Sequence, residues 1–252
     1  MNELALLDVQ GRVARLTLNR PEKRNALSID LLEALHGRVD ELARLAGSDE
    51  GPVVCVVTGA GPSFCSGMDL RAVMSDPALA TQLLNLLAEL TIKLRALPVV
   101  TVARVNGAAI GGGCGLVAVC DIAVTHADSK LGYPEVDLGV CPAVVAPWLV
   151  RAVGSSTARR ILLQGGTMSG QRAFEMGLVA ESTETGMLDQ RVEEIVARLA
   201  KAGPRALRAT KGLINEMDGP ELAAMVRRGA ILSAQVIGGP EAQRMLRNVL
   251  GA

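Results

Sequence analysis

The stretch "VNGAAIGGGCGL" (residues 105–116) has four glycines in five positions and directly follows the apolar run "PVVTVAR" (98–104). Buried apolar sequence normally avoids so much glycine, because glycine loses more backbone entropy on folding than any other residue. Since glycine has no Cβ atom, it also lets another group approach the backbone closely. We therefore expect this loop to present bare backbone to a ligand. The stretch contains no acidic side chain, so an acid or base acting there must come from another segment.

The composition favours a globular protein and argues against several partners. Of the 252 residues, 49% are apolar, which is enough for a substantial core. Aromatic residues are scarce, with one Trp, one Tyr and two Phe, so the platforms on which nucleic-acid bases stack are not expected. The 26 basic and 26 acidic residues cancel without long runs of one charge, and a polyanionic partner is not indicated.

Three features predict a soluble, cytoplasmic protein. The N-terminal "MNELALLDVQ" has no basic segment followed by an apolar one, so we expect no secretion signal. The uncharged apolar stretch "LGVCPAVVAPWLV" (138–150) is too short to span a bilayer and contains two prolines. Five cysteines without CxxC spacing favour a reducing compartment over a disulfide framework.

Strand-like and helix-like segments alternate along most of the chain. Alternating or β-branched runs predict strands at 13–19, 53–59, 99–107 and within 121–135. Between them, Ser28 is expected to cap a helix that reaches about Leu45, and a second helix fits 78–96. This order predicts an α/β fold with parallel strands joined by helical crossovers. We expect an α/β core over 1–190 and a helical segment over 191–252.

Motifs of several common chemistries are missing from the sequence. The two histidines, His36 and His126, have no partner at metal-ligand spacing, so no metal site is expected. Neither the GxSxG element of serine hydrolases nor the Gly-Lys pair of phosphate loops occurs. The loop "GAGPSF" begins like a dinucleotide fingerprint but has Phe64 where a third glycine is needed. We expect neither a nicotinamide nor a flavin cofactor.

Two glycine-containing loops have the same layout. Residues 58–71 ("TGAGPSFCSGMDLR") and residues 106–116 each leave a predicted buried strand and lead into a predicted helix. Backbone amides at such a junction lack helical partners and favour negative charge. At neighbouring strand ends, the two loops could direct two N–H groups at one oxygen and form an oxyanion hole. Taken singly, each loop is equally consistent with a tight turn between a strand and a helix.

Four segments, taken in order, resemble those of a known family. They are "LNRPEKRNALS" (18–28), "TGAGPSFCSGMDL" (58–70), "VNGAAIGGGCGLVAVCDIAV" (105–124) and "LGYPEVDLGVCPA" (131–143). With these segments at family-like spacing, the chain resembles the crotonase superfamily, also called the enoyl-CoA hydratase/isomerase family, over essentially its whole length. The resemblance implies a crotonase-like ββα spiral core. It also implies that the amides of Met68 and Gly112 bind the thioester oxygen of an acyl-CoA and stabilise an enolate.

The resemblance implies further substrate contacts and an oligomer. The backbone near Ala26 would meet the adenine of coenzyme A and Lys23 or Arg24 its phosphate, although such charges are more often simply solvated. The other implied substrate-site residues are Asp69, Leu70, Arg71, Gly111 and Ala143. Asp69 is expected to cap the following helix rather than to act chemically. Family members form trimers or paired trimers, so a homotrimer or hexamer is implied, with Lys211 near a neighbour's CoA phosphate. No separate cofactor is implied, because CoA is part of the substrate.

Hydratases of this family use two glutamates around one water, and the chain retains one of them. The resemblance puts Gly115 at the position of the first glutamate and Glu135, in "GYPEVDLG", at that of the second. Without a second carboxylate nothing fixes the orientation of a water, and orientation is worth orders of magnitude in rate. A single carboxylate can instead move a proton between two carbons. The sequence therefore favours double-bond isomerisation over hydration.

The neighbours of Glu135 define its expected surroundings. They are mainly apolar, and an apolar pocket raises the pKa of a carboxyl group and makes it a better base. In an extended segment Asp137 would face the same side as Glu135, so it stays open as a second acid. Cys114 and Cys141 are expected to flank the pocket as small apolar groups rather than nucleophiles. Ala143 and Trp148 are the candidates for the wall of the acyl pocket.

We therefore expect an enzyme that isomerises enoyl-CoA thioesters. Hydration by a lyase, decarboxylation and thioester hydrolysis stay open within the same family. The resemblance implies that segment 71–96 covers the acyl tunnel, and its mainly apolar residues favour a hydrocarbon acyl chain. A non-catalytic acyl-CoA-binding protein that has lost one glutamate is the alternative from another class.

Overall fold

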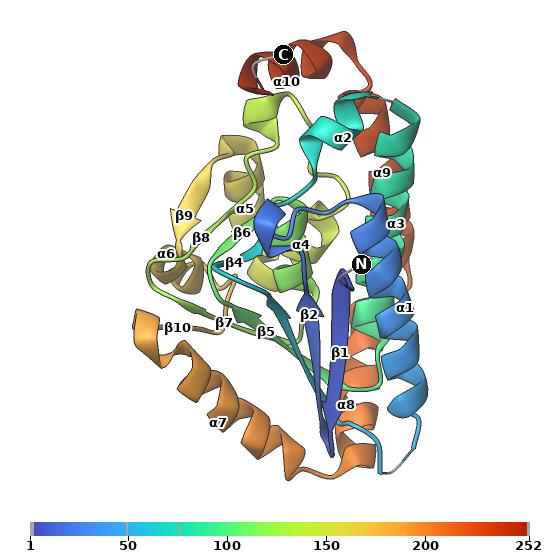
Figure 1. Cartoon of the computed structure of the whole chain (residues 1–252), viewed down its shortest axis with the longest axis vertical. Coiled ribbons are helices and arrows are strands. Elements are labelled where there is room, and N and C mark those ends of the chain that lie inside the picture. The colour runs from blue at the N-terminus through green and yellow to red at the C-terminus, as the bar shows by residue number, and fades with distance from the viewer. Residues whose placement is uncertain (1–2, 49, 76, 251–252) are drawn as a thin grey trace.

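Two β-sheets of mainly parallel strands organise the computed structural model, which describes residues 3–48, 50–75 and 77–250 (Figure 1). The larger sheet has the order β1-β2-β3-β5-β7-β10 and the smaller one the order β4-β6-β8-β9. The strands are β1 (Ala5–Gln10), β2 (Val13–Leu18), β3 (Val54–Gly59), β4 (Ser63–Cys65), β5 (Val100–Val105), β6 (Ala108–Ile110), β7 (Ile122–His126), β8 (Lys130–Gly132), β9 (Thr167–Ser169) and β10 (Glu181–Thr183). In the part described, β1 and β9 pair antiparallel with their neighbours and the other pairs are parallel.

Helices connect the strands and cover both sheets. They are α1 (Ile29–Leu45), α2 (Leu70–Ser75), α3 (Pro77–Ala96), α4 (Gly112–Val119), α5 (Ala146–Gln164), α6 (Gly170–Glu175), α7 (Leu188–Ala200), α8 (Pro204–Met217), α9 (Glu221–Ile237) and α10 (Pro240–Leu250). Short 3₁₀ helices are η1 (Pro21–Lys23), η2 (Val136–Leu138) and η3 (Thr185–Met187).

Successive strand pairs are divided between the two sheets. In each of the pairs β3–β4, β5–β6 and β7–β8 the first strand joins the larger sheet and the second joins the smaller one. A helical segment follows each pair: α2 with α3, then α4, then η2 with α5. The chain therefore winds through repeated ββα units, and the predicted α/β fold with parallel strands is confirmed.

Local sequence explains the elements that were predicted. The expected helix after Ser28 is α1, and the Ser28 hydroxyl accepts a hydrogen bond from the Leu31 amide at 3.3 Å. Its buried residues are Leu31, Leu32, Leu35, Val39 and Leu42, spaced along one helical face. Strand β1 is not among the predicted strands. It lies at the edge of the sheet and only Ala5 in it is buried, so its hydrophobic alternation is weak.

From Leu188 onward the described elements are all helices, and they pack on the core in different places. Helix α7 covers the larger sheet, where Leu188, Val192 and Val196 join a cluster with side chains of β3, β5 and β7. Helix α9 runs beside α3, and α10 lies against α2 and η2 (Figure 1). The C-terminal helices therefore form part of the structure that surrounds the central loops.

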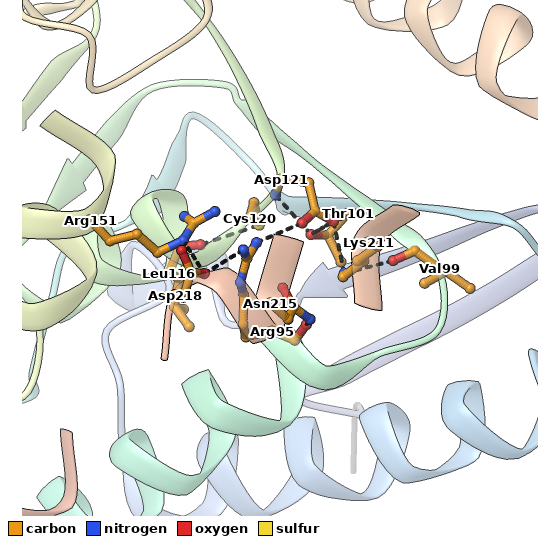
Figure 2. A network of polar contacts seen from close by, with 10 residues as sticks. All are labelled: Arg95, Val99, Thr101, Leu116, Cys120, Asp121, Arg151, Lys211, Asn215 and Asp218. Atoms are coloured by element: carbon orange, nitrogen blue, oxygen red, sulfur yellow. Dashed lines mark hydrogen bonds and ion pairs between the residues drawn. The ribbon is translucent and has the colours of Figure 1, made fainter. Parts of the chain in front are cut away.

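A network of buried charges anchors α8 to this core (Figure 2). The guanidinium of Arg95 on α3 contacts Asp121 at 2.9 Å and Asp218 at 2.7 Å. Arg151 on α5 binds the same Asp218 oxygen at 2.7 Å, and Lys211 binds Asp121 at 2.8 Å. Each buried cation thus has a carboxylate partner, as burial of charge requires.

Lys211 is a structural residue of that network. Its side chain is 7% exposed, and its Nζ also donates a hydrogen bond to the Val99 carbonyl at 2.8 Å. The expectation that it contacts a CoA phosphate of a neighbouring subunit is contradicted, because the ammonium group is buried and already paired within its own chain.

A buried asparagine fixes the loop between β2 and α1. The Nδ2 group of Asn25 donates hydrogen bonds to the carbonyls of Ala60 (3.0 Å), Ser63 (2.9 Å) and Phe64 (3.2 Å), and its Oδ1 accepts one from the Arg20 amide (2.8 Å). Its backbone is left-handed, with φ of 54°, a region that asparagine tolerates better than most residues. Asn25 therefore ties the loop over residues 20–27 to the loop that enters β4.

A second amide side chain fixes the same β3–β4 loop from the other side. Asn106, just after β5, donates hydrogen bonds from Nδ2 to the carbonyls of Gly59 (3.0 Å) and Gly61 (2.8 Å). A Cβ atom on Gly107 would lie 2.0 Å from the Pro62 carbonyl oxygen, so the two loops approach backbone to backbone. The strand ends that precede the two glycine loops are thus held together.

Replacing Asn25 tests how much these loops depend on its amide. We expect Asn25→Ala to lower the free energy of unfolding by about 1–3 kcal/mol, because two buried hydrogen bonds and one partly buried one are lost. Urea unfolding measures the loss. Asn25→Gly is the matched control, since glycine adopts a positive φ freely but also lacks the amide. If Asn25→Gly were as stable as the wild type, the hydrogen bonds would not be what fixes the loop.

Candidate active site

Glu135 reaches the centre of the molecule from the turn that follows β8. Its backbone is helical, and its carbonyl accepts hydrogen bonds from the amides of Leu138 (3.0 Å), the last residue of η2, and Val140 (2.8 Å), which follows η2. The side chain lies against Gly111, whose φ is 54°, so that a Cβ atom placed there would be 2.8 Å from Glu135 Oε1. Only glycine fits at position 111. The carboxyl group therefore sits at the N-terminus of α4.

The environment of this carboxyl group favours its neutral form more than water does. Glu135 Oε2 is buried without a hydrogen-bond partner among the described residues. Burial raises the pKa of Glu135 to about 7, with a smaller contribution from the negative charge of Asp137. The group can therefore take up and release a proton near neutral pH, as a general acid and base must.

Asp137 is placed differently from the expectation. The segment is not extended, because Glu135 is helical and residues 136–138 form η2. Residues two apart in a helical segment do not share a face. The carboxylate of Asp137 instead accepts a hydrogen bond from the Gly166 amide at 2.7 Å, beyond the end of α5. Asp137 therefore holds a turn and is not a second acid beside Glu135.

The bridge between Leu27 and Met68 does not use the backbone amide of Met68. Leu27 pairs with Met68 as an isolated parallel bridge, in which the Leu27 amide donates to Gly67 (2.7 Å) and the Leu27 carbonyl accepts from Asp69 (2.9 Å). In a parallel pair of this kind the amide of the middle residue points to the opposite side. Gly112 opens α4, so its amide has no partner within the helix.

Close contacts bring these three positions into one region. A Cβ atom on Gly67 would lie 2.8 Å from the Ile110 carbonyl oxygen, and one on Gly112 would lie 2.9 Å from Leu27 Cδ1. Leu27 is the bridge partner of Met68, and Glu135 touches Gly111. The loops after β4 and β6 and the turn after β8 therefore meet at the N-terminus of α4 (Figure 1).

The glycine run is bare first of all because the protein itself packs against it. A Cβ atom on Gly113 would lie 2.4 Å from the Cys65 carbonyl oxygen, and one on Gly115 would lie 2.3 Å from Val145 Cγ1. The sequence predicted that another group would approach the backbone of this loop closely. At positions 113 and 115 the approaching groups are atoms of the protein rather than of a ligand. Val145 was not among the sequence candidates, because nothing in its own segment shows that it meets α4.

The loop expected to contact CoA lies at the surface beside Asp69. Lys23 and Arg24 are exposed, and Ala26 is half-buried. Arg20, which sequence reasoning missed, donates hydrogen bonds from Nη1 to the Ala26 carbonyl (3.2 Å) and to Asp69 Oδ2 (3.0 Å). This ion pair joins the loop to the start of α2. The two candidates on that helix are Leu70, which packs against the core, and Arg71, which is exposed.

The candidates for the acyl pocket separate into two kinds. Ala143 and Cys141 line an apolar cavity of about 1090 Å³ between α5 and α9. Trp148 is buried in the core, where its Nε1 donates a hydrogen bond to Thr91 Oγ1 at 3.0 Å, so its expected place in the cavity wall is wrong. Burial raises the pKa of Cys114 to about 12 and also raises that of Cys141, so both thiols stay protonated.

The histidines lie apart from this region. His36 on α1 bonds through Nε2 to the Leu86 carbonyl at 2.9 Å. Among residues 3–48, 50–75 and 77–250 no group of three His, Cys, Asp or Glu side chains could hold a metal ion. Over the same ranges no helix has the length and apolar character needed to cross a membrane.

Comparisons with known proteins identify the family of the chain. The model of the enoyl-CoA hydratase/isomerase family matches residues 8–234. The chain is 35% identical over 225 residues to 2,3-dehydroadipyl-CoA hydratase of Escherichia coli (strain K12), covering 89% of this chain and 86% of the relative. It is 30% identical over 217 residues to crotonyl-CoA hydratase of Syntrophomonas wolfei subsp. wolfei, covering 85% and 82%.

The fold of the chain is also similar to that of solved structures. The crystal structure of an enoyl-CoA hydratase from Mycobacterium avium matches with a TM-score of 0.88 and 29% identity, over 100% of this chain and 97% of that one. The four motifs, the ββα winding and these matches together show that the chain is an enzyme of the enoyl-CoA hydratase/isomerase family.

Proposed function

We propose that this enzyme moves the double bond of an enoyl-CoA thioester, with Glu135 as its single acid and base. The family implies an acyl-CoA substrate, and the relatives are named hydratases, so hydration is the competing reaction. The observation that carries the proposal is a single buried carboxyl group at the N-terminus of α4, where position 115 on the same helix is glycine.

In the proposed reaction the thioester oxygen of a 3-enoyl-CoA lies between the amides of Met68 and Gly112. Glu135 takes a proton from carbon 2, and the electron pair of the broken C–H bond spreads over a dienolate that ends on the thioester oxygen. The two amides and the positive end of α4 stabilise that charge. The protonated Glu135 then gives the proton to carbon 4, which leaves the double bond between carbons 2 and 3.

Two properties of Glu135 support this role over a non-catalytic acyl-CoA binder. A carboxyl group with a pKa near 7 is a stronger base than an exposed one and can still return its proton. A buried carboxyl group without a partner is also costly to the fold, and such groups cluster at functional sites. Thioester hydrolysis and decarboxylation have no specific observation in their favour.

We further propose that copies of the chain associate in a homotrimer or hexamer, and that the enzyme acts in the cytoplasm. Helices α8 and α9 expose large apolar side chains that a partner would cover: Leu213, Ile214, Met217, Met225, Ile231 and Leu232. The five free cysteines suit a reducing compartment. Sedimentation equilibrium should give three or six copies, and a monomer at micromolar concentration would contradict the association.

Rates with two substrates test the function directly. The wild type should convert 3-enoyl-CoA to 2-enoyl-CoA faster than it adds water to 2-enoyl-CoA. Glu135→Gln should lower the isomerisation rate by roughly 10²–10⁴-fold, because the amide can neither accept nor return the proton. Acyl-CoA binding by that variant should stay close to the wild-type affinity.

The matched control is Asp137→Asn, which removes a carboxylate two residues away that holds a turn. It should keep most of the isomerase activity. Faster hydration than isomerisation by the wild type would refute the proposed reaction, and full activity of Glu135→Gln would refute the proposed base.

The pH dependence follows from the raised pKa of Glu135. Because the ionised form is the base, kcat/KM for isomerisation should rise with pH to a plateau, with a midpoint near pH 7. The charge of Asp137 contributes to the raised pKa, so Asp137→Asn should move the midpoint to lower pH. A midpoint near 4.5, the ordinary value for a glutamate, would show that the pKa of Glu135 is not raised in the free enzyme, whose ionisation kcat/KM reports.

A further inference from the structure

Val145 occupies the space beside Gly115 that any side chain at position 115 would need. A Cβ atom on Gly115 would lie 2.3 Å from Val145 Cγ1, 3.0 Å from its Cβ and 3.9 Å from its Cα. These are the three nearest atoms, and all belong to Val145. Val145 is 2% exposed and caps the N-terminus of α5, so its side chain has little room to move away.

Position 115 lies one helical turn beyond the contact between Gly111 and Glu135. The Gly115 amide donates a hydrogen bond to the Gly111 carbonyl at 2.9 Å, and residues four apart share a helix face. Side chains on a helix lean toward its N-terminus. A side chain at position 115 would therefore extend toward Glu135, and Val145 fills the beginning of its path.

We propose that Val145 is a specificity-determining residue, which keeps a second polar group away from Glu135 and thereby selects the double-bond shift over the addition of water. The inference rests on the proposed function of Glu135. In it, Val145 restricts Glu135 to moving a proton between two carbons. A carboxylate at position 115 is then excluded by packing, because the side chain of Val145 occupies the space that it would need.

The two reactions differ in what must be held beside Glu135. In hydration an O–H bond of water breaks, its oxygen bonds to carbon 3 of a 2-enoyl-CoA, the electron pair of the double bond moves into an enolate, and carbon 2 takes a proton. The water must be held by a second polar group while Glu135 exchanges a proton. The methyl groups of Val145 offer no hydrogen bond on that side.

The first experiment measures packing and needs no activity. Gly115→Ala should lower the Tm by about 5 °C, because the added methyl group overlaps Val145. In a Val145→Gly background, the same change should leave the Tm unchanged or raise it, since the nearest remaining atom would be 3.9 Å away. Glycine is also well tolerated at a helix N-cap. Val144→Gly, a buried neighbour not in contact with Gly115, is the matched control and should not rescue Gly115→Ala.

The second experiment measures the reaction. Gly115→Glu combined with Val145→Gly should raise the ratio of 2-enoyl-CoA hydration to 3-enoyl-CoA isomerisation at least tenfold over the wild type. Gly115→Glu alone should not raise it, because the glutamate cannot enter the space that Val145 holds. Circular dichroism and acyl-CoA binding establish that each variant is folded before the ratio is taken.

Two outcomes would overturn the inference. One is an equal Tm change for Gly115→Ala with Val145 present and absent, which would show that the two positions do not compete for space. The other is a folded double variant that isomerises without gaining hydration, which would show that Val145 does not select the reaction. Failure of the proposed function is seen separately, as a wild type that hydrates faster than it isomerises, whatever the Tm values show.

Discussion

The proposed chemistry depends on one carboxyl group that is buried against the glycine-lined N-terminus of α4. Glu135 can lie there only because Gly111 has no Cβ atom and adopts a positive φ. Removal from water raises the pKa of the carboxyl to about 7, while the free amides of α4 favour negative charge next to it. In the proposed reaction, this one packing arrangement therefore supplies both the proton acceptor and the site for the developing oxyanion.

The rest of the fold holds that arrangement in place. Asn25 and Asn106 fix the β3–β4 loop from two sides, so the segment that carries Met68 has a defined position beside β6. The buried charges centred on Asp121, which follows the C-terminal end of α4, and on Asp218 connect α3, α5 and α8 (Figure 2). This group of buried charges is thus structural, whereas the side chain of Glu135 has a buried oxygen without a hydrogen-bond partner among the described residues.

Sequence predicted what depends on local pattern and missed what depends on distant contact. The parallel strands and the Ser28 cap follow from periodicity and capping chemistry, which are local. The orientation of Asp137 was predicted wrongly because its segment was taken as extended. The contacts of Lys211 and Trp148 were predicted wrongly because burial against remote elements decides what these side chains contact. Val145, at the start of α5, packs against Gly115 on α4, and the sequence of neither segment predicts this contact. The repeated ββα winding was predicted from the family resemblance and not from the periodicity of the residues.

A labelled substrate tests the central claim that one carboxyl group carries the proton between two carbons. A 3-enoyl-CoA with deuterium at carbon 2 is converted by the wild type in ordinary water under single-turnover conditions, and the product is analysed by mass spectrometry and NMR. If Glu135 alone moves the proton within a pocket shielded from water, part of the product should carry deuterium at carbon 4. A product with only hydrogen at carbon 4, together with accumulation of the hydrated thioester, would contradict the account.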